Sequence, residues 1–402
     1  MGLGRVHYAF FLGRYFHGPI LYFNFTTSTC YWTKKSHKDL AKFIQENEVI
    51  VRHCYAEIIP FSSESFVKMI LLDSIFIIKH FWRTKQTWPK SCVSNDTSYS
   101  HKCEWKMGSC VFSCQKEQGS PNEDNKEMEN REDRENQEKE YPWLSYNILQ
   151  DLILLENQVP FFVLEELYNS SYRDLSDDQN KGRKDEDNSF LNLVIHYFLY
   201  HWKDSGLSCS SDYKKILSDK KEVRHFNDLL RYFLLPPDQK LKRGKSIKRL
   251  PCATKLAEAG VEFREVKNRP LLDIRFHKSG LLQKFPCLNF SWLLSCFPCF
   301  KCLEKIQPVL ELQAFVVGDA TECVIRNLMA LEQCHYPREA YICNYIVPLD
   351  HLINTAEDVD LLVEKKVIVN WLGSNKIVAN LINKLSHQIV EADHSHYILW
   401  TQ

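Results

Sequence analysis

One stretch of the chain, DLILLENQVPFFVLEEL at residues 151–167, restricts the possible folds more than any other. Residues 152–155 and 161–167 are apolar runs that predict the buried faces of two short helices. The polar triplet 156–158 lies between them, where the first helix leaves free carbonyls and the second leaves free N–H groups. Pro160 suits the first turn of the second helix. We therefore expect the triplet to satisfy the main chain at a corner between two helices; a ligand or partner site is the alternative.

Helical periodicity recurs along most of the chain. The segment FLNLVIHYFLYHW is apolar on nearly every side, which predicts a buried helix. Asp319-x-x-Glu322 and Thr355-x-x-Asp358 each resemble a capping box at the start of a helix. The other segments predicted to be helical follow the same period. Together the predicted helices are residues 65–81, 144–155, 160–167, 190–202, 222–235, 253–259, 319–331, 355–363 and 374–390.

Two further segments have the period of a strand. Apolar and charged residues alternate between Val261 and Phe276, as in a half-buried strand. The run VLELQAFVV at residues 309–317 could pair with it. We therefore predict a mainly α fold, an irregular helical domain with long charged loops, which carries a small antiparallel β element at 261–276 and 309–317.

Long polar segments interrupt these elements. Residues 117–140 contain ten acidic and four basic residues and one apolar side chain, Met128, so this stretch cannot bury a core and is expected to be disordered. The run between Lys240 and Arg249 has six basic residues and no acid, which predicts a mobile loop or, alternatively, a contact with an anionic membrane surface. The predicted organisation is a divergent segment 1–45, one folded domain 46–390 with a disordered acidic insert 115–141, loops 172–189 and 236–250, an atypical insert 284–305, and a divergent tail 391–402.

The amino-acid composition restricts the classes of function and the cell compartments that are compatible with the chain. The 51 basic and 51 acidic residues give a net charge of zero, which argues against a general nucleic-acid binder. The 15 cysteines are odd in number and form no short framework, which predicts mostly reduced thiols. The chain lacks the pattern of a secretory signal and any run of about 18 apolar residues. We therefore expect a cytoplasmic or peripheral protein.

No motif in the sequence indicates a catalytic centre, a cofactor or a metal. The sequence contains no Gly-x-Ser-x-Gly elbow, His-Glu-x-x-His pair or Walker loop. Cys296-x-x-Cys299-x-x-Cys302 has the most metal-like spacing, but a structural zinc needs four ligands and no fourth lies close on its C-terminal side. We interpret these thiols as free, and the same interpretation applies to the looser group of Cys103, Cys110 and Cys114 with His101. His394 and His396 could bind a metal, but we interpret them as part of a frayed tail.

Several blocks occur in an order typical of one plant family. The stretch at 151–167, the block NLMALEQC from Asn327 and the run VNWLG that ends at Gly373 resemble the hallmarks of the domain of unknown function 247 family, also called the UPF0481 proteins. The resemblance covers roughly residues 50–390. The matching residues that we take as structural candidates are Leu155, Glu156, Asn157, Gln158, Pro160, Phe161, Asn327, Glu332, Asn370, Trp371 and Gly373.

The chain departs from the family pattern in three places. Members usually end in a basic stretch and one hydrophobic helix, so the resemblance implies a membrane-attached protein, but residues 391–402 read EADHSHYILWTQ. Near the N-terminus, Arg14 stands where the family's Ser-Ile-Gly-Pro-x-His-His-Gly-like segment has proline. Residues 284–305 interrupt what would be a short link between two strands. Our hypothesis is that this insert is retained non-coding sequence or an error of gene prediction.

Three functional hypotheses follow. The first is a plant-specific, non-enzymatic interaction or recognition protein at or near a membrane, with an unknown protein partner. Some grass members of the family are linked to pollen–stigma self-incompatibility, so the resemblance implies a recognition role for the class. The second is an unrecognised hydrolase-like enzyme. The third is a truncated or mis-annotated copy without function.

Overall fold

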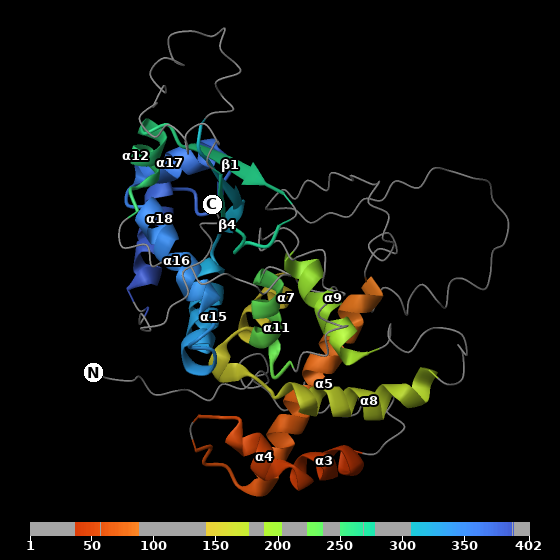
Figure 1. The fold of residues 1–402 in the computed structure, drawn as a ribbon. Helices are drawn as coiled ribbons and strands as arrows, with labels where there is room; N and C mark the ends of the chain where they lie inside the picture. Colours follow the sequence, from red (N-terminus) through yellow and green to blue (C-terminus); the bar gives the residue numbers. More distant parts are fainter. Residues whose placement is uncertain are drawn as a thin grey trace, which may run out of the picture.

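The computed structural model describes residues 37–56, 58–87, 142–176, 189–202, 223–235, 250–267, 269–277, 307–387 and 389. The helices of this part of the chain are α3 (His37–Glu46), α4 (Glu48–His53), α5 (Ser63–Thr87), α7 (Pro142–Leu152), the 3-10 turn η2 (Leu155–Asn157), α8 (Phe161–Ser176), α9 (Phe190–Trp202), α11 (Phe226–Leu234), α12 (Ala253–Glu258), α15 (Thr321–His335), α16 (Tyr341–Leu352), α17 (Ala356–Glu364) and α18 (Asn375–Ser386). The strands are β1 (Glu262–Val266), β2 (Arg275–His277), β3 (Val309–Gln313), β4 (Phe315–Val317) and β5 (Ile368–Asn370). Figure 1 shows α3 and α4 at one end of the molecule and the strands toward the other.

The mainly helical architecture with a small β component confirms the predicted fold class. The predicted helix at 190–202 coincides with α9, because a segment that is apolar on every side can be buried along its whole length. The predicted helix at 65–81 lies inside α5, which extends to Thr87. Three helices were not predicted: α3, α4 and α16.

The N-terminal helices pack around a cluster of aromatic rings. The long helix α5 lies against α3, α8 and α9. Phe81 of α5 contacts Tyr197 of α9, with ring centroids 4.3 Å apart, and Phe226 of α11 at 5.6 Å. Phe190 at the start of α9 contacts Phe161 at the start of α8, with tilted rings whose centroids are 5.2 Å apart. Each such pair adds about 0.5–1.5 kcal/mol beyond the burial of its surface, so the cluster holds four helices together.

All of helix α3 except its last residue, Glu46, lies within residues 1–45, the predicted divergent segment. Its side chains Leu40 and Ile44 are buried in the core of the molecule. The helix packs on α5 and α8, so at least this part of the segment belongs to the folded unit. The domain boundaries themselves stay a prediction.

The larger sheet is mixed, which corrects the predicted antiparallel element. Its strand order is β1-β3-β2, with β1 parallel and β2 antiparallel to β3. Between β1 and β2, the apolar side chains Leu271, Leu272 and Ile274 are buried in the core. This link carries the chain past the central position to the far edge, so that β3 enters between the two earlier strands.

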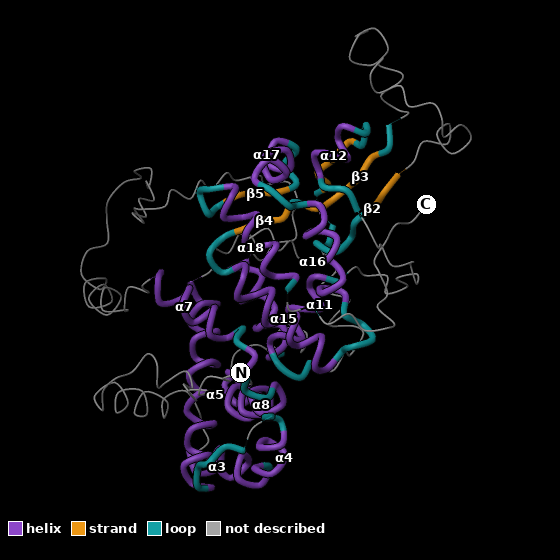
Figure 2. The backbone as a smooth tube through the Cα atoms, turned by 90° about the vertical axis from the view of Figure 1, so that its left-hand side faces the viewer, coloured by secondary structure: helices purple, strands orange, loops and turns teal. Residues whose placement is uncertain are grey.

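The predicted strand 309–317 is divided between two sheets. Its first part is β3, and after Ala314 its second part, β4, pairs in parallel with β5. Phe315 and Val317 of β4 are buried, as is Ile368 of β5. The smaller sheet therefore connects the strand region to the C-terminal helices. Figure 2 shows α17 above β4 and β5, and α15, α16 and α18 below them.

The C-terminal helices α15, α16, α17 and α18 pack on one another. The predicted capping box at Thr355 and Asp358 is confirmed at the start of α17. The one predicted at Asp319 is wrong, because α15 begins at Thr321 after Ala320 in helical conformation. Instead, the hydroxyl of Thr321 accepts the N–H of Gly318 at 2.9 Å.

Several predictions concern residues outside the described part of the chain. They are the disordered insert 115–141, most of the loops 172–189 and 236–250, the insert 284–305, the tail 391–402 and the cysteine and histidine groups near residues 101–114, 296–302 and 394–396. Among the residues that the structure does describe, no helix combines the length and the apolar character needed to cross a bilayer.

Candidate functional site

Gln158 lies at the centre of the corner between α7 and α8. Its amide Nε2 donates to the carbonyls of Leu152 and Leu154, both at 2.7 Å. Its Oε1 accepts the backbone N–H of Phe226, the first residue of α11, at 3.1 Å. Because the side chain is buried, water could not replace it as the hydrogen-bond partner of these two carbonyls and this N–H group. One side chain thus joins the end of α7 to the start of α11.

The polar triplet was expected to satisfy the free N–H groups at the start of α8, but the partner of the first of them is a main-chain carbonyl. The N–H of Phe161 donates to the carbonyl of Arg224 at 2.7 Å. Pro160, which precedes Phe161, is buried. Gln158 has extended backbone, with φ −87° and ψ 129°, so the chain turns away between η2 and α8. The corner residues therefore contact a third helix, α11, in addition to the two that flank them.

Asn327 of the NLMALEQC block connects α15 to the same corner. Its Oδ1 accepts the N–H of Leu155 at 2.7 Å, and its Nδ2 donates to the carbonyl of Cys323 at 2.8 Å. The neighbouring Asn157 is buried and donates to the carbonyl of Asp151 at 3.3 Å. Glu156, in contrast, is exposed. Two motifs 172 residues apart in sequence therefore meet through one amide.

Glu332 forms a second buried polar centre with Arg231 of α11. Its Oε1 accepts from Arg231 Nε at 2.9 Å, and both side chains are buried. Its Oε2 accepts the N–H groups of Ile342 at 2.8 Å and Cys343 at 3.1 Å, in the first turn of α16. Burial raises the pKa of Glu332 to about 7, against the opposing effects of Arg231 and the two N–H groups. The pair holds the first turn of α16 against α11.

Asn370, Trp371 and Gly373 form the turn between β5 and α18. Asn370 accepts the N–H of Leu372 at 2.8 Å and donates to Asn375 Oδ1 at 2.6 Å. Gly373 has φ +79°, a conformation that favours glycine. Trp371, one of the structural candidates from the sequence, is 52% exposed. A side chain added at Gly318 would lie 3.7 Å from its ring, so one part of the tryptophan faces that loop.

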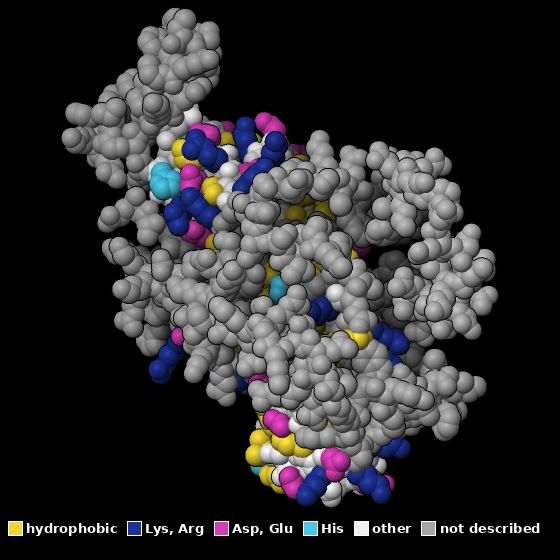
Figure 3. Space-filling model, turned by 90° about the vertical axis from the view of Figure 1, so that its right-hand side faces the viewer, with side chains coloured by type: hydrophobic (Ala, Val, Ile, Leu, Met, Phe, Trp, Pro, Cys, Tyr) yellow, Lys and Arg dark blue, Asp and Glu magenta, His cyan; other side chains and the backbone are white. Residues whose placement is uncertain are grey.

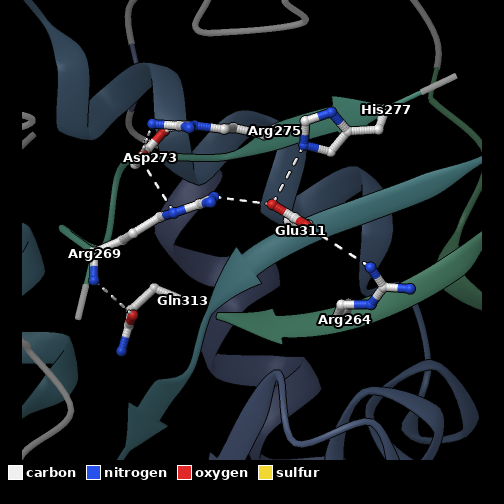
Figure 4. A network of polar contacts seen from close by, with 7 residues as sticks. All are labelled: Arg264, Arg269, Asp273, Arg275, His277, Glu311 and Gln313. Atoms are coloured by element: carbon white, nitrogen blue, oxygen red, sulfur yellow. Dashed lines mark hydrogen bonds and ion pairs between the residues drawn. The ribbon is translucent and has the colours of Figure 1, made fainter. Parts of the chain in front are cut away.

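A different polar cluster covers the outer face of the sheet β1-β3-β2. Arg264, Glu311 and Arg275 occupy one register row across the three strands. Glu311 Oε2 lies 3.0 Å from Arg269 Nη1 and 3.3 Å from His277 Nε2 (Figure 4). Burial favours a higher pKa for Glu311, but the hydrogen bonds and charges of Arg269 and His277 outweigh it and lower that pKa.

The second carboxylate of this cluster is Asp273. It accepts two hydrogen bonds from Arg275, both at 2.9 Å. These bonds and the charge of Asp273 raise the pKa of Arg275. Sequence reasoning missed the cluster because its residues come from three separate strands and from the link between β1 and β2. The signal available in the sequence was the set of charged residues that alternate with apolar ones between Val261 and Phe276.

Three of the described cysteines lack the properties of activated thiols. Burial raises the pKa of Cys343 to about 12, and it also raises the pKa of Cys323 and Cys54. A thiol with a raised pKa is rarely ionised at neutral pH and is therefore a poor nucleophile. Over the same described ranges, no three His, Cys, Asp or Glu side chains are grouped so that they could hold a metal ion.

Comparisons with known proteins agree on one family. The family model described as "Plant protein of unknown function" (DUF247) matches residues 21–401. A UPF0481 protein of Arabidopsis thaliana is 29% identical over 281 residues, which cover 63% of this chain and 49% of that protein. The chain thus aligns with about half the length of this curated relative. No solved structure matches the chain.

Proposed function

The chain belongs to the DUF247 family of plant proteins of unknown function, and from this premise we propose that it is a non-enzymatic interaction protein that recognises a protein partner. The observation that carries the proposal is how its polar groups are used. Gln158, Asn327 and Glu332 hold main-chain groups of distant segments. Polar side chains that are used in this way stabilise the fold, as expected of a structural scaffold.

The exposed polar groups have a different character. Arg264, Arg275 and His277 project from one face of a sheet that is supported beneath by buried Phe263, Leu310 and Leu312. A rigid support of this kind presents side chains in a fixed arrangement, as recognition surfaces do. The raised thiol pKa values of Cys323 and Cys343 also fit a protein without nucleophilic catalysis.

The proposed place of action is at or near a membrane. The support is the basic run between Lys240 and Arg249, which has the composition of a segment that contacts anionic lipid. Co-sedimentation with phosphatidylserine vesicles tests this part. The full chain should bind, and a variant with the basic residues of the run changed to glutamine should bind less. Equal binding of the two proteins would contradict the proposed contact.

Proximity labelling of the full chain in plant cells tests the central proposal. We expect a reproducible set of labelled proteins that an unfused labelling enzyme does not produce. Purified protein should show no turnover of ester, peptide or phosphoester substrates above that of a heat-denatured sample. Absence of any reproducible partner, or turnover that is lost on denaturation, would contradict the proposal.

A further inference from the structure

We propose that the outer face of the sheet β1-β3-β2 binds an acidic, extended segment of a partner protein. The proposal rests on the function proposed above and names the surface and the chemistry of the partner. Figure 3 shows basic and acidic side chains gathered at the end of the molecule that carries the strands in Figure 1. The register of the three strands places the relevant side chains on one face.

The two faces of the sheet have opposite characters. Phe263, Leu310 and Phe276 form a register row on the inner face, where the first two are buried. Successive side chains of a strand point to opposite faces. The next row, which contains Arg264, Glu311 and Arg275, therefore lies on the outer face. Glu262, Val309 and His277 form a further outer row.

On this outer face two arginines and a histidine project, and two of the carboxylates are recessed. The side chains of Arg264, Arg275 and His277 are 50%, 46% and 53% exposed. Those of Glu311 and Asp273 are only 15% and 9% exposed. The recessed carboxylates orient the guanidinium groups from below. A partner approaching the sheet therefore meets N–H donors first, apart from Glu262, which is 37% exposed at the edge beside Arg264.

The guanidinium groups retain hydrogen-bonding capacity. Arg264 donates through Nη2 to Glu262, and Arg275 donates through Nε and Nη2 to Asp273. A guanidinium carries five N–H donors. Within the residues that the structure describes, Arg264 Nε and Arg275 Nη1 have no hydrogen-bond partner. Each of the two oriented guanidinium groups can therefore donate a charge-assisted hydrogen bond from a spare N–H to a partner carboxylate.

The spacing of the row fits an extended chain. Arg264 and Arg275 are two strands apart, which corresponds to roughly 10 Å between their backbones. In an extended peptide, side chains on one side repeat about every 7 Å, and the long arginine side chains can span the difference. An Asp- and Glu-rich peptide can therefore reach both arginines at once.

Fluorescence anisotropy with a labelled Asp/Glu-rich peptide tests the proposal. The full chain should bind this peptide and should not bind a Lys-rich peptide of the same length. Arg264→Gln combined with Arg275→Gln should weaken binding at least about tenfold, because two charge-assisted contacts are lost. Arg264→Lys combined with Arg275→Lys should weaken it less, since the charge remains and only the fixed direction of the guanidinium N–H donors is lost.

A matched control changes two exposed lysines at the opposite end of the molecule. Lys38→Gln with Lys42→Gln on α3 removes the same charge and should change affinity by less than about twofold. Thermal melting establishes that every variant is folded. The proposal is overturned if the arginine variant binds as wild type, if the lysine control loses as much affinity, or if free phosphate binds this face and the peptide does not.

One further experiment distinguishes a failure of this inference from a failure of the proposed interaction function. Proximity labelling with the folded Arg264→Gln, Arg275→Gln protein should lose partners that wild type labels. An unchanged set of partners would contradict the sheet face as the binding surface and leave the interaction function standing. An empty set for wild type would contradict the interaction function itself.

Discussion

Gln158 accepts the backbone N–H of Phe226, 68 residues further along the chain, at 3.1 Å. The same side chain donates to two carbonyls at the end of α7. Three hydrogen bonds of one buried amide therefore fix the relative positions of α7 and α11. Gln158 stabilises this corner through hydrogen bonds to main-chain groups, and its contribution to the free energy of unfolding can be measured.

Replacement of Gln158 by alanine should lower the free energy of unfolding by roughly 2–3 kcal/mol, since it leaves a buried N–H and two carbonyls without this partner. Chemical denaturation measures this loss. Gln45→Ala on the exposed surface of α3 is the control and should change stability by less than about 0.5 kcal/mol. Equal stability of Gln158→Ala and wild type would contradict a structural role for the corner.

The buried ion pair should behave differently from a surface pair. Glu332→Gln or Arg231→Met should each cost about 3–5 kcal/mol of unfolding free energy, because one buried charge loses its partner. The double variant should cost less than the sum of the two. Glu322→Gln, which breaks the partly exposed pair with Arg326, should cost less than about 1 kcal/mol. Strictly additive losses at Arg231 and Glu332 would show that the pair is not coupled.

Two half-buried histidines predict a loss of stability in acid. Burial lowers the pKa of His80 to about 3 and that of His201 to about 4, below the ordinary 6.5. Below pH 6.5 the unfolded chain takes up protons that the folded chain excludes, so the free energy of unfolding falls as the pH decreases toward these values.

Denaturation at several pH values tests this prediction. His201→Phe should show a shallower decrease between pH 6.5 and pH 4 than wild type. The exposed His53→Gln is the control and should retain the wild-type slope. A slope unchanged by His201→Phe would mean that this imidazole does not remain neutral in the fold.

The turn before α18 should require glycine for its backbone conformation. Gly373 has φ +79°, and an added Cβ would meet no atom within 4 Å. Gly373→Ala should therefore cost about 1 kcal/mol through backbone strain alone, and Gly373→Asn should cost less because asparagine tolerates this conformation. Thermal melting distinguishes the two. A larger loss for asparagine than for alanine would indicate crowding, contrary to the prediction.

The parts of the fold that depend on local pattern could be predicted. The apolar α9 and the capping box of Thr355 and Asp358 are examples, because both are encoded within a few neighbouring residues. The helix α16 was missed since Pro348 lies inside it, and proline usually ends a helix. Its first turn is held by Glu332, which comes from another helix.

The parts that depend on distant contacts could not. Alternation predicted the strands, but it has the same form in parallel and antiparallel pairs, so the direction of β1 relative to β3 was wrong. The row of Arg264, Glu311 and Arg275 requires the register of three strands. Likewise, nothing local indicates that Asn327 would bind Leu155. These contacts are set by the packing of the whole chain.

Hydrogen exchange at the backbone amides of Phe226 and Leu155 tests the scaffold most directly, because their partners are the side chains of Gln158 and Asn327. We predict that both amides exchange only through global unfolding, with a free energy of opening equal to that of denaturation. In Gln158→Ala, the amide of Phe226 should lose this protection. Rapid exchange of both amides in the wild-type protein, far above the rate of global unfolding, would show that the corner opens locally and would contradict its role as a scaffold.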